Sequence, residues 1–301
     1  MWVRPFRRSP VASVAVAALL TGCSASEGAV APQASAASGT AVIVTVGDST
    51  RPGNTATLRL LPRASANRVD VTTASRVKLL YVVPSDGIDR RRDTDGSISR
   101  SIGSGQRWLA SQTGGRTIRF DLSDDALDIT YVRLPRAEAT YFGFGAYIRD
   151  SIQKDLRAAG WTQRDVLLLA YYEGRHVDRC ASAAWPPVIA GSAAVVYLHG
   201  APESELPCDG NEFAESPNDA PGYMEFVVLH ELFHLLGVVS LQAPDEALSG
   251  HVNSDPTDLM YAGTRPWRPA TVDVSKRNYY SPSALPSGVK NFAESPFVIA
   301  P

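Results

Sequence analysis

The sequence has no surplus of positive charge and no long apolar run. Its 29 Lys and Arg residues are balanced by 31 Asp and Glu residues, which gives a formal net charge of -2 at pH 7. Nucleic-acid binders usually carry a basic surplus, so we expect no nucleic-acid partner. The apolar segment VASVAVAALL, residues 11–20, is too short to span a bilayer comfortably. With 44% hydrophobic and 20% charged residues among 301, the composition is that of a globular protein.

The N-terminus has the features of an export signal. Arg4, Arg7 and Arg8 precede the apolar segment, and small residues follow it. The signal ends in LTGC, Leu20 to Cys23, which resembles the bacterial lipobox, where the chain is cut before a cysteine that then receives lipid. We therefore expect a lipoprotein signal peptide over residues 1–22 and a lipid anchor at Cys23 on the extracytoplasmic face of the cell membrane. Cleavage a few residues later, with Cys23 left as a spare thiol, is the alternative.

Only three cysteines are present, and their use follows from export. Once Cys23 is assigned to the anchor, Cys180 and Cys208 remain as an even pair in an oxidising compartment. The simplest expectation is one disulfide between them. Two buried free thiols are the alternative.

The remaining chain divides by pattern. Residues 23–40 are rich in Ala, Ser, Gly and Pro without periodicity, which predicts a flexible tether. Residues 41–76 show strand-like alternation around a turn-rich stretch and predict a small β appendage. From Val77 onward, apolar strands alternate with helices, which predicts an α/β domain with a mostly parallel sheet flanked by helices over residues 77–301. The expected strands are 77–83, 117–121, 129–134, 165–172 and 193–200, and the expected helices between them are 97–112 and 147–160.

A further helix is expected over residues 218–237, after the last of these strands. Asp219 is a candidate cap at its start, and Gly237 stands where the helix should end. His230 and His234 are one turn apart, so their imidazoles project from the same face and can bind a single metal ion. Glu231 lies beside the metal position, where a general base for hydrolysis belongs. A core helix with two satisfied histidines is the alternative interpretation.

These residues resemble the metzincin zinc peptidases, whose pattern is HExxHxxGxxH or D followed downstream by a methionine-containing turn. His230, Glu231, His234 and Gly237 match the pattern, and DLMY, Asp258 to Tyr261, is similar to the Met-turn with Met260 as its methionine. The resemblance implies a metzincin-like α/β fold with a loop-rich C-terminal part, bound Zn²⁺ and a protein or peptide substrate. It also implies that the strand over residues 192–200, just before the helix, is an edge strand that pairs with substrate.

The sequence departs from the metzincin pattern at Ser240, which stands where the third ligand should be. A neutral hydroxyl is a poor zinc ligand, so that ligand must come from elsewhere or the site is damaged. His251 is the only histidine between the helix and the expected Met-turn, and a longer loop can return it to the metal. The other candidate ligands in this loop are Asp245, Asp255 and Asp258. A solvated loop histidine is the alternative for His251.

Several other residues are weaker candidates. His176 is expected on a surface loop, and His199 at the rim of the site. Three tyrosines, Tyr261, Tyr279 and Tyr280, are candidates for an oxyanion-stabilising hydroxyl, although core packing explains each equally well.

The expected function is zinc-dependent hydrolysis of peptide bonds in extracytoplasmic proteins or peptides. A non-catalytic, metal-stabilised surface lipoprotein that binds a partner is the main alternative. Zinc-dependent hydrolysis of another class of substrate also remains open.

The lipid assignment predicts the effect of Cys23→Ser. Because the lipid is the only membrane anchor visible in the sequence, the variant should leave the membrane fraction for the medium or remain unprocessed. Fractionation followed by N-terminal mass analysis measures both outcomes. A correctly cleaved variant that stays in the membrane would refute the assignment.

Overall fold

A five-stranded, mostly parallel sheet organises the part of the chain that the structure describes. The computed structural model describes residues 42–47, 55–68, 72–185, 192–201, 208 and 221–301. The strand order is β7-β3-β8-β10-β9, with every neighbouring pair parallel except β10 and β9. The strands are β3 (Arg76–Val83), β7 (Ile129–Arg133), β8 (Val166–Tyr172), β9 (Ala181–Ser182) and β10 (Ala193–Tyr197). The predicted α/β class with a mostly parallel sheet is confirmed.

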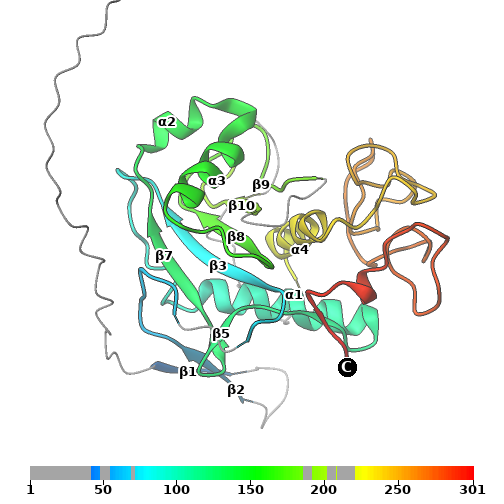
Figure 1. Cartoon of the computed structure of the whole chain (residues 1–301), viewed down its shortest axis with the longest axis horizontal. Helices are drawn as coiled ribbons and strands as arrows, with labels where there is room; N and C mark the ends of the chain where they lie inside the picture. Colours follow the sequence, from blue (N-terminus) through cyan, green and yellow to red (C-terminus); the bar gives the residue numbers. More distant parts are fainter. Residues whose placement is uncertain (1–41, 48–54, 69–71, 186–191, 202–207, 209–220) are drawn as a thin grey trace, which may run out of the picture. The chain divides into compact units, whose positions relative to one another are not determined.

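Helices cover both faces of this sheet (Figure 1). On one face lie α1 (Ser97–Thr113) and α4 (Tyr223–Leu236), and on the other lies α3 (Ile148–Ala158). Because successive strand residues point to opposite faces, Leu79 and Leu169 pack toward α1 and α4, whereas Leu80 packs toward α3. All residues of β3, β8 and β10 are buried, as expected for parallel strands covered on both sides.

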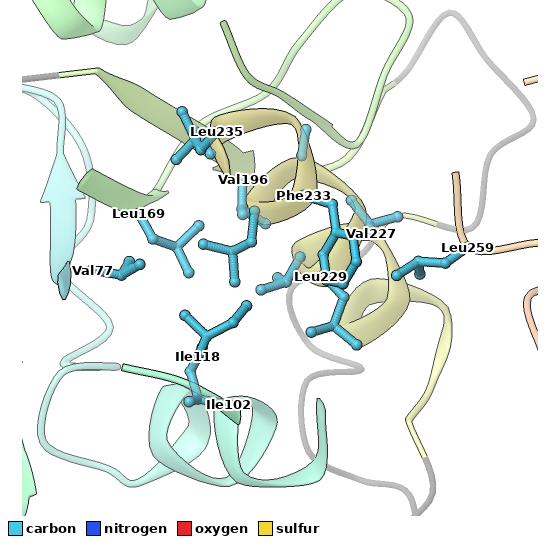
Figure 2. Packing of buried hydrophobic residues seen from close by; sticks show 14 of the residues in the cluster. Val77, Ile102, Ile118, Leu169, Val196, Val227, Leu229, Phe233, Leu235 and Leu259 are labelled. Carbon is cyan, nitrogen blue, oxygen red and sulfur yellow. The ribbon is translucent and has the colours of Figure 1, made fainter. Parts of the chain in front are cut away.

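The core between the sheet and α4 is continuous with α1 and with the C-terminal region. Figure 2 shows Val227, Leu229 and Phe233 of α4 among side chains from the sheet, from α1 and from Leu259. Helix α4 is apolar nearly all round its circumference, so it is buried between the sheet and the C-terminal segments. The chain after it, residues 238–301, contains only η3 (Phe292–Glu294) and β11 (Val298–Ile299) as regular elements, which confirms the loop-rich C-terminal part.

Smaller elements complete the fold. The antiparallel pair β1 (Val42–Gly47) and β2 (Thr55–Leu60) forms where strand-like alternation was expected. Two further small sheets pair β5 (Leu122–Ser123) with β6 (Ala126–Leu127), and β4 (Thr117–Ile118) with β11. The segment between β7 and α3 contains α2 (Glu138–Phe142) and η1 (Gly145–Tyr147).

The expected strand over residues 117–121 is only partly present. Its first two residues form β4 and pair with the C-terminal β11 instead of joining the main sheet. Asp121 lies at its end and accepts hydrogen bonds from Lys78 at 3.1 Å and from Arg76 at 3.1 Å. Lys78 is buried and also contacts Asp128. These ion pairs, together with backbone hydrogen bonds from Val77 N–H to Arg119 and from Asp121 N–H to Val77, hold the segment beside β3 without a continuous ladder.

The strand before α4 is not the edge of the sheet, contrary to expectation. Strand β10 lies between β8 and the short strand β9, which pairs with it antiparallel at Val195 and Val196. Among the strands that the structure describes, the edge is therefore β9. Sequence periodicity does not reveal this arrangement because β9 has only two residues.

The predicted disulfide is confirmed, since Cys180 and Cys208 are bonded with their Cα atoms 5.1 Å apart. Cys180 immediately precedes β9 and therefore ties the start of the edge strand to the chain that leads into α4. The predicted signal peptide, the tether and Cys23 lie outside the described residues. Among the described residues, no helix is long and apolar enough to cross a membrane.

The disulfide predicts a measurable loss of stability in a Cys180→Ser, Cys208→Ser double variant. The bond closes a loop with a sequence separation of 28, and such a bond contributes about 3–4 kcal/mol by restricting the unfolded chain. The melting temperature should fall by roughly 10 °C for a protein of this size. Thermal unfolding measures the loss, and equal stability of the double variant would contradict the prediction.

Candidate metal centre

Helix α4, which packs against β9 and β10, carries two histidines and a glutamate close together. The helix begins after Gly222, whose backbone N–H donates to the Glu225 carboxylate at 3.0 Å, and it ends at Gly237 in the left-handed conformation. The expected end at Gly237 is thus confirmed, whereas Asp219 lies outside the described residues. His234 and Glu231 are buried and His230 is partly buried.

His251 joins the two helical histidines. Its Nε2 atom lies 3.0 Å from Nε2 of His234 and 3.1 Å from Nε2 of His230, and the latter two atoms are also 3.1 Å apart. The three Nε2 atoms thus form a nearly equilateral triangle. Among the described residues, these three histidines are the only group of His, Cys, Asp or Glu side chains arranged to hold a metal ion.

The loop after α4 brings His251 to this position through four residues with positive φ, which are Gly237, Val239, Ser249 and Gly250. Gly237 has φ 69° and Gly250 has φ 79°, a region that glycine occupies without strain. Beyond His251, the Val252 N–H donates to the Met260 carbonyl at 3.0 Å and the Val252 carbonyl accepts from Ala262 N–H at 2.9 Å. The ligand is therefore fixed to the turn that contains Met260.

The predicted Met-turn lies directly beside His230. The Leu259 carbonyl accepts a hydrogen bond from Nδ1–H of His230 at 2.8 Å, which directs Nε2 of that ring toward the other histidines. Asp258 organises the turn, because its carboxylate accepts from Met260 N–H at 2.8 Å, Val274 N–H at 2.9 Å and the Tyr279 hydroxyl at 2.6 Å. Met260 itself is fully buried.

Ser240 and the loop aspartates lie outside the histidine cluster. The Ser240 hydroxyl accepts from Lys290 N–H at 3.5 Å, so it faces the C-terminal segment. Asp245 exchanges two hydrogen bonds with Asn278, and Asp255 accepts from the backbone and hydroxyl of Thr257. Of the candidates for the third ligand, only His251 reaches the cluster.

The donor chemistry of the cluster fits a metal ion. His251 donates Nδ1–H to the Leu248 carbonyl at 2.7 Å, just as His230 donates to Leu259, so both Nε2 atoms present lone pairs to each other. Burial lowers the pKa of His230 to about 3 and that of His234 well below its usual value, so the rings are neutral. Two nitrogen ligands of a tetrahedral ion are about 3.3 Å apart, close to the spacing found here. A cation would satisfy all three lone pairs at once.

Glu231 lies beside this cluster on the sheet side of α4. The residue Glu231 is 9% exposed. Its carboxylate accepts a hydrogen bond from the Ala183 backbone N–H, just after β9. Burial raises the pKa of Glu231 to about 8, and the positive charge of Arg179 opposes this shift. A pKa near 8 keeps the Glu231 side chain largely protonated at neutral pH. A cation at the histidine cluster would favour its carboxylate form, which could then accept a proton from water.

The other two histidines are not part of the centre. His176 is buried, not on the surface as expected, and its ring packs on Tyr197 with centroids 4.6 Å apart. Burial lowers its pKa to about 4. The Nε2 atom of His199 lies 3.0 Å from the Glu173 carboxylate, which also binds Arg90 and Arg92. This cluster, in which Glu173 and Arg92 are buried and Arg90 and His199 are exposed, was not anticipated, because its members are far apart in the sequence.

The three candidate tyrosines have structural contacts. The Tyr279 hydroxyl donates to Asp258, and the Tyr261 hydroxyl accepts from Arg265 N–H at 2.9 Å. Tyr280 is buried and packs against Phe292. Trp267, which the sequence did not single out, packs edge-on to His230 with centroids 5.5 Å apart and donates to the Asp258 carbonyl at 3.1 Å.

Comparison of the chain with protein-family models, with curated proteins and with solved structures finds no match.

The geometry predicts that His251→Ala weakens metal binding about as severely as His234→Ala, since each removes one of three imidazole ligands. Ser240→Ala should leave binding nearly unchanged, because that hydroxyl faces Lys290. Zn²⁺ titration and elemental analysis of the metal-loaded protein measure both effects. Normal affinity in the His251 variant would remove this residue from the ligand set.

Proposed function

We propose that the chain is a zinc metallopeptidase that hydrolyses peptide bonds in extracytoplasmic proteins or peptides. The observation that carries the proposal is the triangle of Nε2 atoms from His230, His234 and His251 with Glu231 beside it at the edge of the sheet. A purely structural metal site needs no buried carboxylate next to its ligands. The pairing of the two features therefore favours an enzyme.

Zinc suits three imidazole ligands, and when bound in such a site it polarises a carbonyl group and lowers the pKa of water. The chain's own residues supply the remaining parts of the reaction. His230 and His251 keep their Nε2 atoms free of protons because Nδ1–H of each is held by a carbonyl. Glu231 accepts a proton from the attacking water at its carboxylate and passes it to the amide nitrogen that leaves.

The edge strand supports a peptide as the substrate. Strand β9 lies at the end of the sheet, and Ala183, just beyond it, donates to Glu231. An extended peptide that pairs with β9 on the side away from β10 would place its backbone beside this carboxylate. Such binding uses backbone hydrogen bonds and requires little of the substrate sequence. We therefore propose β9, and not β10, as the strand that pairs with substrate.

The proposal includes two features that rest on sequence patterns. The HExxHxxG pattern and the turn at Met260 resemble those of metzincins, and the position of this turn beside His230 supports that resemblance. The LTGC motif supports a lipid anchor at Cys23, which would hold the enzyme on the extracytoplasmic face of the cell membrane.

The alternative is a surface lipoprotein that binds metal for stability and recognises a partner without catalysis. A fold can keep its metal ligands while losing activity, so the two functions differ at Glu231 and not at the histidines.

Glu231→Gln should abolish peptide hydrolysis while fold and zinc content survive. Glutamine keeps the size of the side chain but cannot accept the proton, and a general base typically contributes 10²- to 10⁴-fold in rate. The measurement is cleavage of a peptide selected from a broad library, with wild type and variant at equal zinc occupancy.

Glu225→Gln is the matched control, because Glu225 is a buried glutamate of the same helix at its start, away from the histidines. It should retain full activity. Equal cleavage by wild type and Glu231→Gln would disprove the mechanism. A zinc-loaded wild type that cleaves nothing across the library would favour the partner-binding function.

A further inference from the structure

One short segment, residues 180–185, approaches both Glu231, the proposed general base, and Gly250, the residue before the proposed third ligand His251. It begins at the disulfide of Cys180, continues through β9, and donates from Ala183 N–H to Glu231. It ends at Trp185, whose indole lies against the backbone of Gly250. Gly250 directly precedes His251. The segment therefore extends from Glu231 to the residue that precedes His251.

The contact between Trp185 and Gly250 is close enough to exclude a side chain. A Cβ atom at Gly250 would overlap the indole ring at Nε1, Cδ1 and Cε2. Gly250 also has φ 79°, which a residue with a side chain adopts only with strain. Its N–H donates to the Glu246 carboxylate at 3.2 Å. The close indole and the positive φ both require glycine at position 250. The indole of Trp185 occupies the space where a side chain would otherwise lie.

His251 is consequently held from two sides. Val252 is bonded to the Met260 turn on one side, and the indole of Trp185 covers Gly250 on the other. His251 is carried by a loop, unlike the two ligands on α4, whose positions are fixed by helical hydrogen bonds. Nearby Leu248, whose carbonyl orients the His251 ring, is 74% exposed and gives the loop little packing of its own. The loop has internal hydrogen bonds, from Ala247 N–H to the His251 carbonyl at 3.0 Å and from His251 N–H to the Leu248 carbonyl at 3.2 Å, and the Trp185 contact adds to them.

We propose that Trp185 is a positioning residue that fixes His251 in the metal centre by packing on Gly250. This role rests on the metal centre of the proposed function but not on peptide hydrolysis. Because β9 is anchored by the disulfide and by β10, Trp185, three residues beyond the strand, lies close to a fixed element, and its indole limits the positions that the loop can take. Residues that orient a ligand without touching the metal typically contribute 10- to 100-fold in metal affinity.

The test is a double-variant cycle on zinc affinity, measured in the full mature chain by competition with a chromophoric chelator. Trp185→Ala should weaken zinc binding by about 10- to 100-fold, and Trp185→Phe, which keeps a flat ring, should retain most of the affinity. In a His251→Ala background, Trp185→Ala should add little, because the ligand on which it acts is gone. The visible spectrum of the Co²⁺-loaded protein should change between wild type and Trp185→Ala, since it reports ligand geometry.

Trp161→Ala is the control for general loss of stability. Trp161 is a buried tryptophan that packs in the core on the opposite face of the sheet, so its removal should destabilise the fold without weakening zinc binding. Wild-type zinc affinity in Trp185→Ala, an equal loss in Trp161→Ala, or an undiminished loss in the His251→Ala background would each overturn the proposal. So would a wild type that binds no zinc at these histidines. Wild type that binds zinc but cleaves no peptide would overturn only the peptidase function.

Discussion

The Nε2 atoms of His230, His234 and His251 lie 3.0–3.1 Å apart in a largely buried position. Those of His230 and His251 present lone pairs, because their rings donate Nδ1–H to carbonyls. Lone pairs at this spacing repel one another unless a proton or a cation lies among them. Burial disfavours protonated rings, so a metal ion is better suited than a proton to lie among the three Nε2 atoms. The orientation of α4, the return of the loop at Gly250 and the turn at Met260 all serve this one cluster.

The three histidines have different surroundings. His230 and His234 lie on α4 in the apolar core, whereas His251 lies on a loop. Helix α4 is enclosed by the sheet, by α1 and by the C-terminal segments, so His230, Glu231 and His234 are fixed by a continuous apolar core (Figure 2). Asp258 holds the Met260 turn with three hydrogen bonds. His251, by contrast, lies on a loop whose leucines are exposed at Leu241 and Leu248. Its position depends on contacts from distant parts of the chain.

The edge of the sheet connects these two sides to the expected substrate. Strand β9 is short, but the disulfide at Cys180 and its pairing with β10 hold it in place. Within a few residues it reaches Glu231 through Ala183 and Gly250 through Trp185. A peptide bound along β9 would therefore contact the same segment that approaches Glu231, the proposed base, and Gly250, which precedes the proposed third ligand. In the proposed enzyme, substrate binding and the integrity of the centre share one structural element.

The sequence by itself determined the α/β class, the disulfide, the helix with His230, Glu231 and His234, and its end at Gly237, because these depend on periodicity, cysteine parity or spacing along one helix. It ranked His251 above three aspartates but did not exclude them, since loop residues have no periodicity that fixes where they point. Only the tertiary structure decided that Ser240 faces Lys290, that β9 and not β10 is the edge, that His176 is buried, and that Trp185 packs on Gly250. Each of these depends on contacts between residues distant in sequence, which local patterns do not encode.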